Sequence, residues 1–146
     1  MNHYYNAEYY KGIIDHLEVF SLTLKLNGTW GIDIGTYWFP LKPVKRADVI
    51  SFKADDFIKY FGYVSLRECL DKNSVIVEVR EWSENVFVIN FENFEPEYGN
   101  GGEGYWFDRN MKWIIYCSHE NSITFGGEDL IKRIKENWKE WNQHIW

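Results

Sequence analysis

Three consecutive residues near the end of the chain, Ser118, His119 and Glu120, are of the types that nucleophilic catalysis uses. A serine hydroxyl can attack a carbonyl carbon, an imidazole can take the hydroxyl proton, and a carboxylate can orient the imidazole. Their spacing argues against this use, because neighbouring residues of an extended chain point to opposite sides and triads are assembled in space. A polar turn between two strands is the favoured interpretation. His119 alone stays a candidate for acid–base chemistry near neutral pH.

A second group of candidates lies between positions 92 and 108, in a stretch rich in acids, glycines and aromatic residues and without lysine or arginine. Carboxylates steer and orient a basic partner, while tyrosine and tryptophan supply contact area. We therefore expect a surface for a basic protein, with a solvated loop as the alternative. Trp82 and Trp106 fall in predicted loop or edge regions and are expected to be exposed. The partner-binding candidates are Glu95, Glu97, Tyr98, Glu103, Tyr105, Trp106, Asp108 and Trp82.

The other residues that could carry chemistry favour neither a metal site nor a cofactor. Cys69 and Cys117 form no CxxC pair, and no two histidines are spaced i, i+4, so the spacing of a zinc site is absent. The acids lack the spacing of an EF-hand calcium loop. Gly126-Gly127 is followed by Glu128 and Asp129, which would repel phosphate. We expect no metal, no cofactor and, for the two cysteines, small buried side chains rather than a disulfide.

Length and composition are typical of one globular domain spanning residues 1–146. A formal net charge of -6 argues against a nucleic-acid partner and mildly favours a basic protein, with solubility alone as the alternative. The aromatic share of 19% suits either a stiff core or a binding face. No apolar run approaches the length of a membrane span, and the first residues lack a secretory signal, so we expect a cytoplasmic protein. The oligomeric state is left open.

Periodicity near the N-terminus predicts a helix followed by a hairpin. Residues 9–17 carry apolar side chains at helical spacing, after Asn6 as a plausible N-cap. Apolar and polar residues then alternate over 22–34, interrupted by Asn27-Gly28. This dipeptide between two alternating runs predicts a β-hairpin, because both turn positions need positive φ.

The middle of the chain predicts one edge strand and two helices. Residues 37–39 are aromatic and precede Pro40, which suits a short edge strand. Residues 52–61 place aromatic side chains on one side of a helix that Gly62 would end. A capping box at its start predicts a second short helix over 65–72, with apolar side chains facing inward.

The second half of the chain predicts hairpins and a closing helix. A period of two predicts strands, and adjacent strands joined by short loops pair antiparallel. These strands cover 74–80, 86–92, a strand starting at 105–107, 113–117 and 123–125. Residues 118–121 form the turn of the last hairpin. From Glu128 onward, one face of a long amphipathic helix carries Leu130, Ile134, Trp138, Trp141 and Ile145.

The order of these elements predicts an α+β domain. One antiparallel β-sheet is built from hairpins, helices pack on one face, and the long C-terminal amphipathic helix lies against the sheet. Residues 95–104, rich in glutamate, glycine and asparagine, form a long loop or the tip of a hairpin.

The stretch from Trp113 to Gly127, WIIYCSHENSITFGG, together with Trp138 and Trp141, resembles the closing segment of small bacterial proteins. Some of those proteins are similar to immunity proteins, which neutralise secreted toxins. The resemblance covers about the last quarter of the chain. It implies a cytoplasmic antidote that binds a cognate toxin, often a basic nuclease, and it assigns no role to any single residue.

Three hypotheses follow from the sequence. The leading one is a non-enzymatic binding protein, an immunity protein whose acidic, aromatic surface covers a basic toxin. The second is a small hydrolase or ligand-binding domain that uses His119 and a pocket between sheet and helix. The third is a structural or regulatory subunit in which exposed aromatic residues hold an oligomer.

Overall fold

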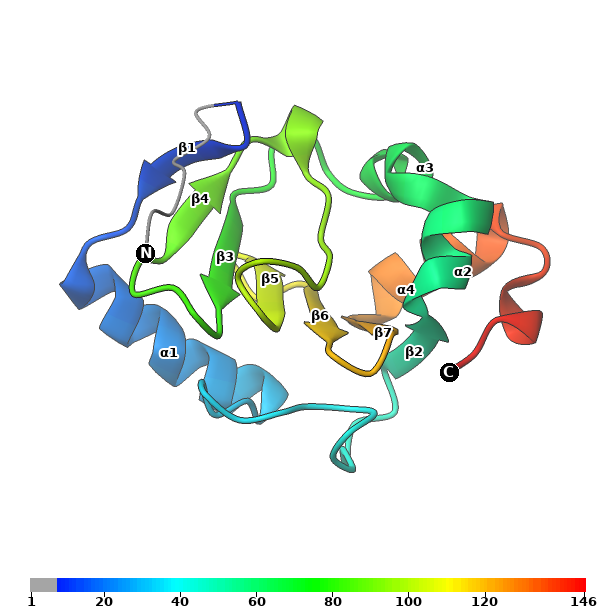
Figure 1. The fold of residues 1–146 in the computed structure, drawn as a ribbon, viewed down its shortest axis with the longest axis horizontal. Helices are drawn as coiled ribbons and strands as arrows, with labels where there is room; N and C mark the ends of the chain where they lie inside the picture. Colours follow the sequence, from blue (N-terminus) through cyan, green and yellow to red (C-terminus); the bar gives the residue numbers. More distant parts are fainter. Residues whose placement is uncertain (1–7) are drawn as a thin grey trace.

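Within residues 8–146, seven strands form one antiparallel sheet, which confirms the α+β class (Figure 1). The computed structural model describes residues 8–146. Across the sheet the strand order is β1-β4-β3-β5-β6-β7-β2. The strands are β1 (Tyr10–Ile13), β2 (Val49–Lys53), β3 (Ile76–Arg80), β4 (Phe87–Ile89), β5 (Gly104–Asp108), β6 (Ile114–Ser118) and β7 (Ser122–Gly126). The helical elements are α1 (His16–Trp30), α2 (Ala54–Asp56), η1 (Phe57–Phe61), α3 (Gly62–Glu68), η2 (Phe91–Asn93), α4 (Glu128–Asn137) and η3 (Trp141–Gln143).

Helix α1 shows that the hairpin prediction for residues 22–34 is wrong. Asp15 caps the helix by accepting a hydrogen bond from the Glu18 amide at 2.9 Å. Gly31 ends it in the left-handed conformation at φ 68°, which glycine adopts without steric cost. Leu22 and Leu26 are buried one helical turn apart. The Asn-Gly pair lies inside the last turns of the helix, where packing of the apolar face overrides its turn preference.

The expected helix over residues 9–17 is also wrong, because Tyr10–Ile13 is an edge strand. Strand β1 pairs antiparallel with β4, and a register shift between Tyr10 and Gly12 marks a bulge. The Tyr9 carbonyl accepts from the Asn90 amide, and the Ile14 amide donates to Val86, both at 2.8 Å. The proposed N-cap Asn6 lies outside the described residues.

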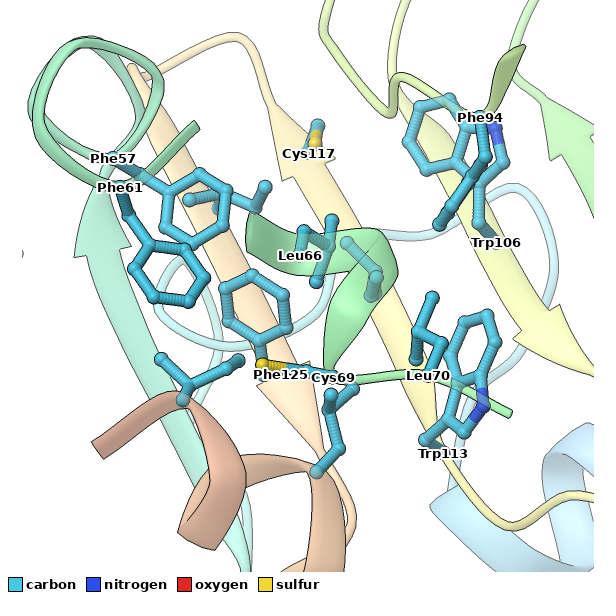
Figure 2. Packing of buried hydrophobic residues seen from close by; sticks show 14 of the residues in the cluster. Phe57, Phe61, Leu66, Cys69, Leu70, Phe94, Trp106, Trp113, Cys117 and Phe125 are labelled. Carbon is cyan, nitrogen blue, oxygen red and sulfur yellow. The ribbon is translucent and has the colours of Figure 1, made fainter. Parts of the chain in front are cut away.

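Helices cover both faces of the sheet, so the expectation that they pack on one face is corrected. Helix α1 packs Leu26 against one face, which also carries Phe107 and Tyr116. Helices α3 and α4 cover the opposite face, to which β5, β6 and β7 contribute Trp106, Ile115 and Phe125. Figure 2 shows the second cluster, in which aromatic rings from η1 and β7 meet Leu66 and Cys69 of the α3 segment. Both faces are apolar because the central strands are buried on each side.

Residues 37–39 and 52–72 differ from their predicted elements. Residues 37–39 form no strand; instead, the Phe39 carbonyl accepts a hydrogen bond from the Thr124 hydroxyl at 2.7 Å. The predicted helix over 52–61 begins two residues later, since β2 continues through Lys53. Gly62, at φ 84°, caps the end of η1 as predicted, but α3 follows directly, with Ser65 inside it rather than at a cap. The apolar side chains expected to face inward from residues 65–72 are buried, as Leu66, Cys69 and Leu70 show.

The strands predicted in the second half are present, but the one expected over 86–92 is shorter, because β4 ends at Ile89 and η2 covers Phe91–Asn93. Strand β3 pairs with β4 and β5, and β6 pairs with both β5 and β7. The turn between β6 and β7 holds Asn121 at φ 57°, a left-handed conformation that asparagine tolerates. This turn presents His119 at one end of the sheet.

The closing helix is shorter than predicted and ends at Asn137. Ile134 and Trp138 are buried as expected, but the Trp138 backbone has left the helical region. The Trp138 ring lies between 5.1 and 5.9 Å from the rings of Phe52, Phe57 and Phe61. The last residues then run beside β2, where Ile145 bridges Phe52. Packing of one indole into the aromatic cluster therefore ends the helical periodicity early.

Two features of the surface of residues 8–146 bear on function. None of the helices described there has the length and apolar character needed to cross a lipid bilayer. The outer side of α1 carries an apolar stripe formed by Leu17, Phe20 and Leu24, and Leu17 is 86% exposed.

Candidate partner-binding surface and the His119 site

Four of the predicted partner-binding residues are buried: Glu103, Tyr105, Trp106 and Asp108. They lie on or beside β5, which is central because β3 and β6 flank it. The expectation that Trp106 is exposed is therefore wrong. Its ring points into the cluster beside Phe94 (Figure 2), and its Nε1 donates to the Glu78 carboxylate at 2.9 Å. The aromatic residues at 105–107 would suit a central strand as well as an edge strand. Which of the two they form depends on the order of the strands in the sheet, which the sequence does not reveal.

The other four candidates, Trp82, Glu95, Glu97 and Tyr98, are exposed as expected. Trp82 is 52% exposed in the loop between β3 and β4. Its amide donates to the Gly101 carbonyl at 3.0 Å, which ties this loop to the segment that carries the acids. Gly102, at φ 78°, lets the backbone pass so close to Trp82 that a Cβ there would lie 3.0 Å from the indole. Trp82 is therefore held in place although half of it faces solvent.

Arg80, at the end of β3, is hydrogen-bonded to the segment that carries Glu97 and Gly102. Its Nη1 donates to the Gly102 carbonyl at 3.1 Å and its Nη2 to the Glu97 carbonyl at 3.0 Å. Its guanidinium carbon lies 4.9 Å from the centroid of the Trp106 ring. Its Nε also pairs with the buried Glu78 carboxylate at 3.4 Å. The arginine charge is thus directed at the backbone and the core, while the carboxylates of Glu81 and Glu97 stay on the surface.

Two acids that the sequence argument did not select, Glu81 and Glu84, flank Trp82 and are exposed. They extend the surface formed by the four exposed candidates. We call this surface the acidic rim and define it by Glu81, Trp82, Glu84, Glu95, Glu97 and Tyr98. The sequence held a signal for the two additional acids, because both lie between the strands predicted over 74–80 and 86–92. The sequence does not reveal that this loop contacts the segment at 99–102.

The buried carboxylate of Glu103 forms the second candidate site with His119 and Tyr116. It accepts hydrogen bonds from the Tyr116 hydroxyl, from the His119 amide at 3.0 Å, and from Nδ1 of the same imidazole. Because an ionised carboxylate can only accept, Nδ1 carries a proton and Nε2 is the nitrogen left for chemistry. Nε2 lies 3.4 Å from the exposed Glu120 carboxylate. Sequence order suggested Glu120 as the orienting acid, whereas the fold supplies Glu103.

The electrostatics of this site raise two pKa values. Hydrogen bonding to Glu103 raises the pKa of His119 above its ordinary value, so the imidazolium persists to higher pH. Burial, followed by the hydrogen bond to Glu103, raises the pKa of Tyr116, whose phenol stays neutral. The Ser118 hydroxyl is buried and bonds to the Ser122 hydroxyl, so it does not act as a partner of His119 in nucleophilic attack. The site can exchange a proton, but the Ser118 hydroxyl is bonded to Ser122 rather than to the imidazole.

Clefts lie on each side of this site. One of about 340 Å³ lies between α1, residues 34–37 and the loop after β3, and Glu103 contributes to its lining. Another of about 370 Å³ is lined by His119 together with Asp55, Glu97 and Tyr98. Within residues 8–146 no three histidine, cysteine or acidic side chains are grouped in a way that could hold a metal ion.

Comparison of the chain with protein-family models, with curated proteins and with solved structures found no match.

Proposed function

We propose that the chain is a non-enzymatic binding protein that takes a basic protein as its partner through the acidic rim. The observation that carries this proposal is Trp82, half exposed and held against the Gly101–Gly102 backbone in the loop that also carries Glu81 and Glu84. An ordered, exposed indole loses little conformational freedom on binding, and tryptophan is enriched among the residues that dominate interface energy. The surrounding carboxylates favour association with a positively charged surface.

The specific form we propose is an immunity protein that neutralises a cognate toxin in the cytoplasm. This rests on the resemblance of the closing segment and on the acidic character of the rim. Carboxylates in the rim would stand where the phosphates of a substrate bind in a basic active site. Covering such a site requires no chemistry from the antidote, which agrees with a surface made of acids and aromatic rings.

Affinity capture from the native cell tests the proposal. The wild-type bait is compared with Trp82→Ala and with the double variant Glu95→Gln/Glu97→Gln. Tyr60→Ala is the matched control for loss of an exposed aromatic ring, because Tyr60 is 53% exposed on η1. Glu136→Gln/Glu140→Gln, which changes two exposed acids at the C-terminal end, makes the same change in net charge. We expect one basic protein at near-equal stoichiometry with the wild type and both controls. If the wild type, the two rim variants and the two controls all capture the partner equally, the acidic rim is not part of the interface.

A second candidate function, proton transfer at His119, is favoured by the Glu103 hydrogen bond to its Nδ1. A carboxylate in this position fixes the ring orientation and directs Nε2 outward, as in sites of general acid–base catalysis. The adjoining cleft of about 370 Å³ has the size of a small-molecule site.

Hydrolysis of chromogenic carboxylic and phosphate esters separates this candidate from the binding protein. Under the second function, wild-type protein accelerates hydrolysis and His119→Ala abolishes the acceleration. Activity that survives in His119→Ala, or is absent from the wild type, counts against it.

A further inference from the structure

The cleft of about 340 Å³ beside Trp82 combines apolar walls with carboxylates. Its walls come from three separate elements, with Val19 on α1, Ile34 on the segment after α1, and Val79 on β3. Glu81 and Glu84 belong to the same lining and also to the acidic rim. The cleft therefore opens within the surface proposed to meet a basic protein.

We propose that this cleft receives a lysine side chain of the basic partner. A lysine has a four-carbon apolar stem and a compact charged head. The aliphatic walls would remove the stem from water, while the carboxylates pair with the ammonium group. The inference rests on the proposed function, since it names the anchor that the partner inserts into the rim.

The carboxylates are arranged to favour a cation. Glu81 Oε1 accepts a hydrogen bond from the Glu103 amide at 3.2 Å, which holds its carboxylate in position before any ligand binds. Glu103 already accepts from Tyr116 and His119, so the charge open to a ligand comes from Glu81 and Glu84. Arg80 also contributes to the lining, but its guanidinium lies over the Trp106 ring in the cluster on the other face.

The separate positions of the two carboxylates favour lysine over arginine. Arginine gains most from planar, bidentate pairing with a single carboxylate and from stacking on aromatic faces. The walls combine branched aliphatic side chains such as Val19 and Val79 with Tyr37 and Tyr105, so the walls themselves do not select between the two cations. An ammonium group has three donors that can be shared among separate acceptors. This suits the carboxylates of Glu81 and Glu84, which come from separate positions of one loop.

Two-dimensional ¹H–¹⁵N NMR titration of the full chain tests the inference with defined probes. The first probe is Nα-acetyl-lysine N-methylamide, the second its norleucine analogue, which keeps a four-carbon stem without the ammonium, and the third its arginine analogue. The variant Glu84→Gln removes a cleft carboxylate, and Glu95→Gln removes a rim carboxylate that does not line the cleft.

We expect the lysine probe to shift amide signals of residues 34–37 and 81–84 saturably, with about tenfold higher affinity than the norleucine probe. Glu84→Gln should weaken lysine binding about threefold, and Glu95→Gln should leave it unchanged. Absence of saturable shifts, equal binding of norleucine, or tighter binding of arginine would each overturn the assignment.

The outcome is separable from that of the proposed function. If the lysine probe does not bind while capture of a basic protein still depends on Trp82, the assignment of the cleft to lysine is wrong and the proposed function is retained. If the lysine probe binds but capture of a basic protein does not depend on the acidic rim, the assignment of the cleft is retained and the proposed function is wrong.

Discussion

The Glu103 carboxylate accepts hydrogen bonds from both the amide and the imidazole of His119, although strands β5 and β6 separate the two residues along the chain. The contact fastens the turn between β6 and β7 to the start of β5. It also links a buried carboxylate to a group that titrates near neutral pH.

The stability of the fold should depend on pH through His119. Glu103 raises the pKa of His119 in the folded state, so the imidazolium contributes stability that is complete below the unfolded pKa of about 6.5. This contribution is lost as pH rises through the folded pKa. Urea unfolding of wild type and His119→Gln should show a difference in the free energy of unfolding at about pH 6 that narrows as the pH rises above the unfolded pKa. A difference that is constant across this range would contradict the linkage.

Removing the hydroxyl that bonds to Glu103 should destabilise the fold. In Tyr116→Phe the buried carboxylate loses one donor, and leaving a buried polar group short of a partner costs about 1–3 kcal/mol. Chemical denaturation measures the change in the free energy of unfolding. Tyr98→Phe, which alters an exposed tyrosine, serves as the control with an expected change below about 0.5 kcal/mol. Equal effects of the two variants would show that Glu103 does not depend on the Tyr116 hydroxyl.

Leu24 and Leu26 should respond very differently to truncation, because α1 points them to opposite sides. Leu26 is fully buried, whereas Leu24 is 60% exposed. We expect Leu26→Ala to lower the free energy of unfolding by about 2–5 kcal/mol and Leu24→Ala to change it by less than about 0.5 kcal/mol. In a strand these two residues would share one face and the costs would be similar. Similar measured costs would therefore contradict the helix.

The same two leucines show why part of the fold could not be predicted from the sequence. Leu22, Leu24 and Leu26 alternate with polar residues, a pattern that indicates a strand, yet Leu22, Leu26 and Trp30 are also spaced for a helix. Asp15 and Gly31 are the helix signals, but the apolar stripe at Leu17, Phe20 and Leu24 on the exposed side obscures the periodicity. Strand β3 and the β6–β7 hairpin were predictable, because their alternation is supported by turn residues between them.

The candidate site was predictable where it depends on one segment and unpredictable where it depends on contacts between segments. Glu95, Glu97 and Tyr98 are exposed as their local composition indicates. Trp106 has similar composition around it, but pairing of β5 with β3 and β6 buries it. The partnership of Glu103 with His119 requires β5 and β6 to be neighbours, which residue spacing does not reveal.

Trp82 should be an energetic centre of the interface with a basic partner. Truncation to alanine removes an exposed, positioned indole and should raise the dissociation constant by about 30-fold, equivalent to about 2 kcal/mol. The free energy of unfolding should be nearly unchanged, because half of the ring already contacts solvent. Calorimetric titration with the captured partner measures the first quantity, and urea denaturation the second. A dissociation constant within about twofold of the wild type would exclude Trp82 from the contact.

The most direct test of the acidic rim is the salt dependence of the association rate with the captured basic protein. For the wild type and the control Glu136→Gln/Glu140→Gln, the rate constant should fall steeply as ionic strength rises, because rim carboxylates steer the encounter. For Glu95→Gln/Glu97→Gln, the rate at low salt should be lower and the dependence shallower. If the rim variant and the control show the same salt dependence as the wild type, the partner binds elsewhere and the central claim is wrong.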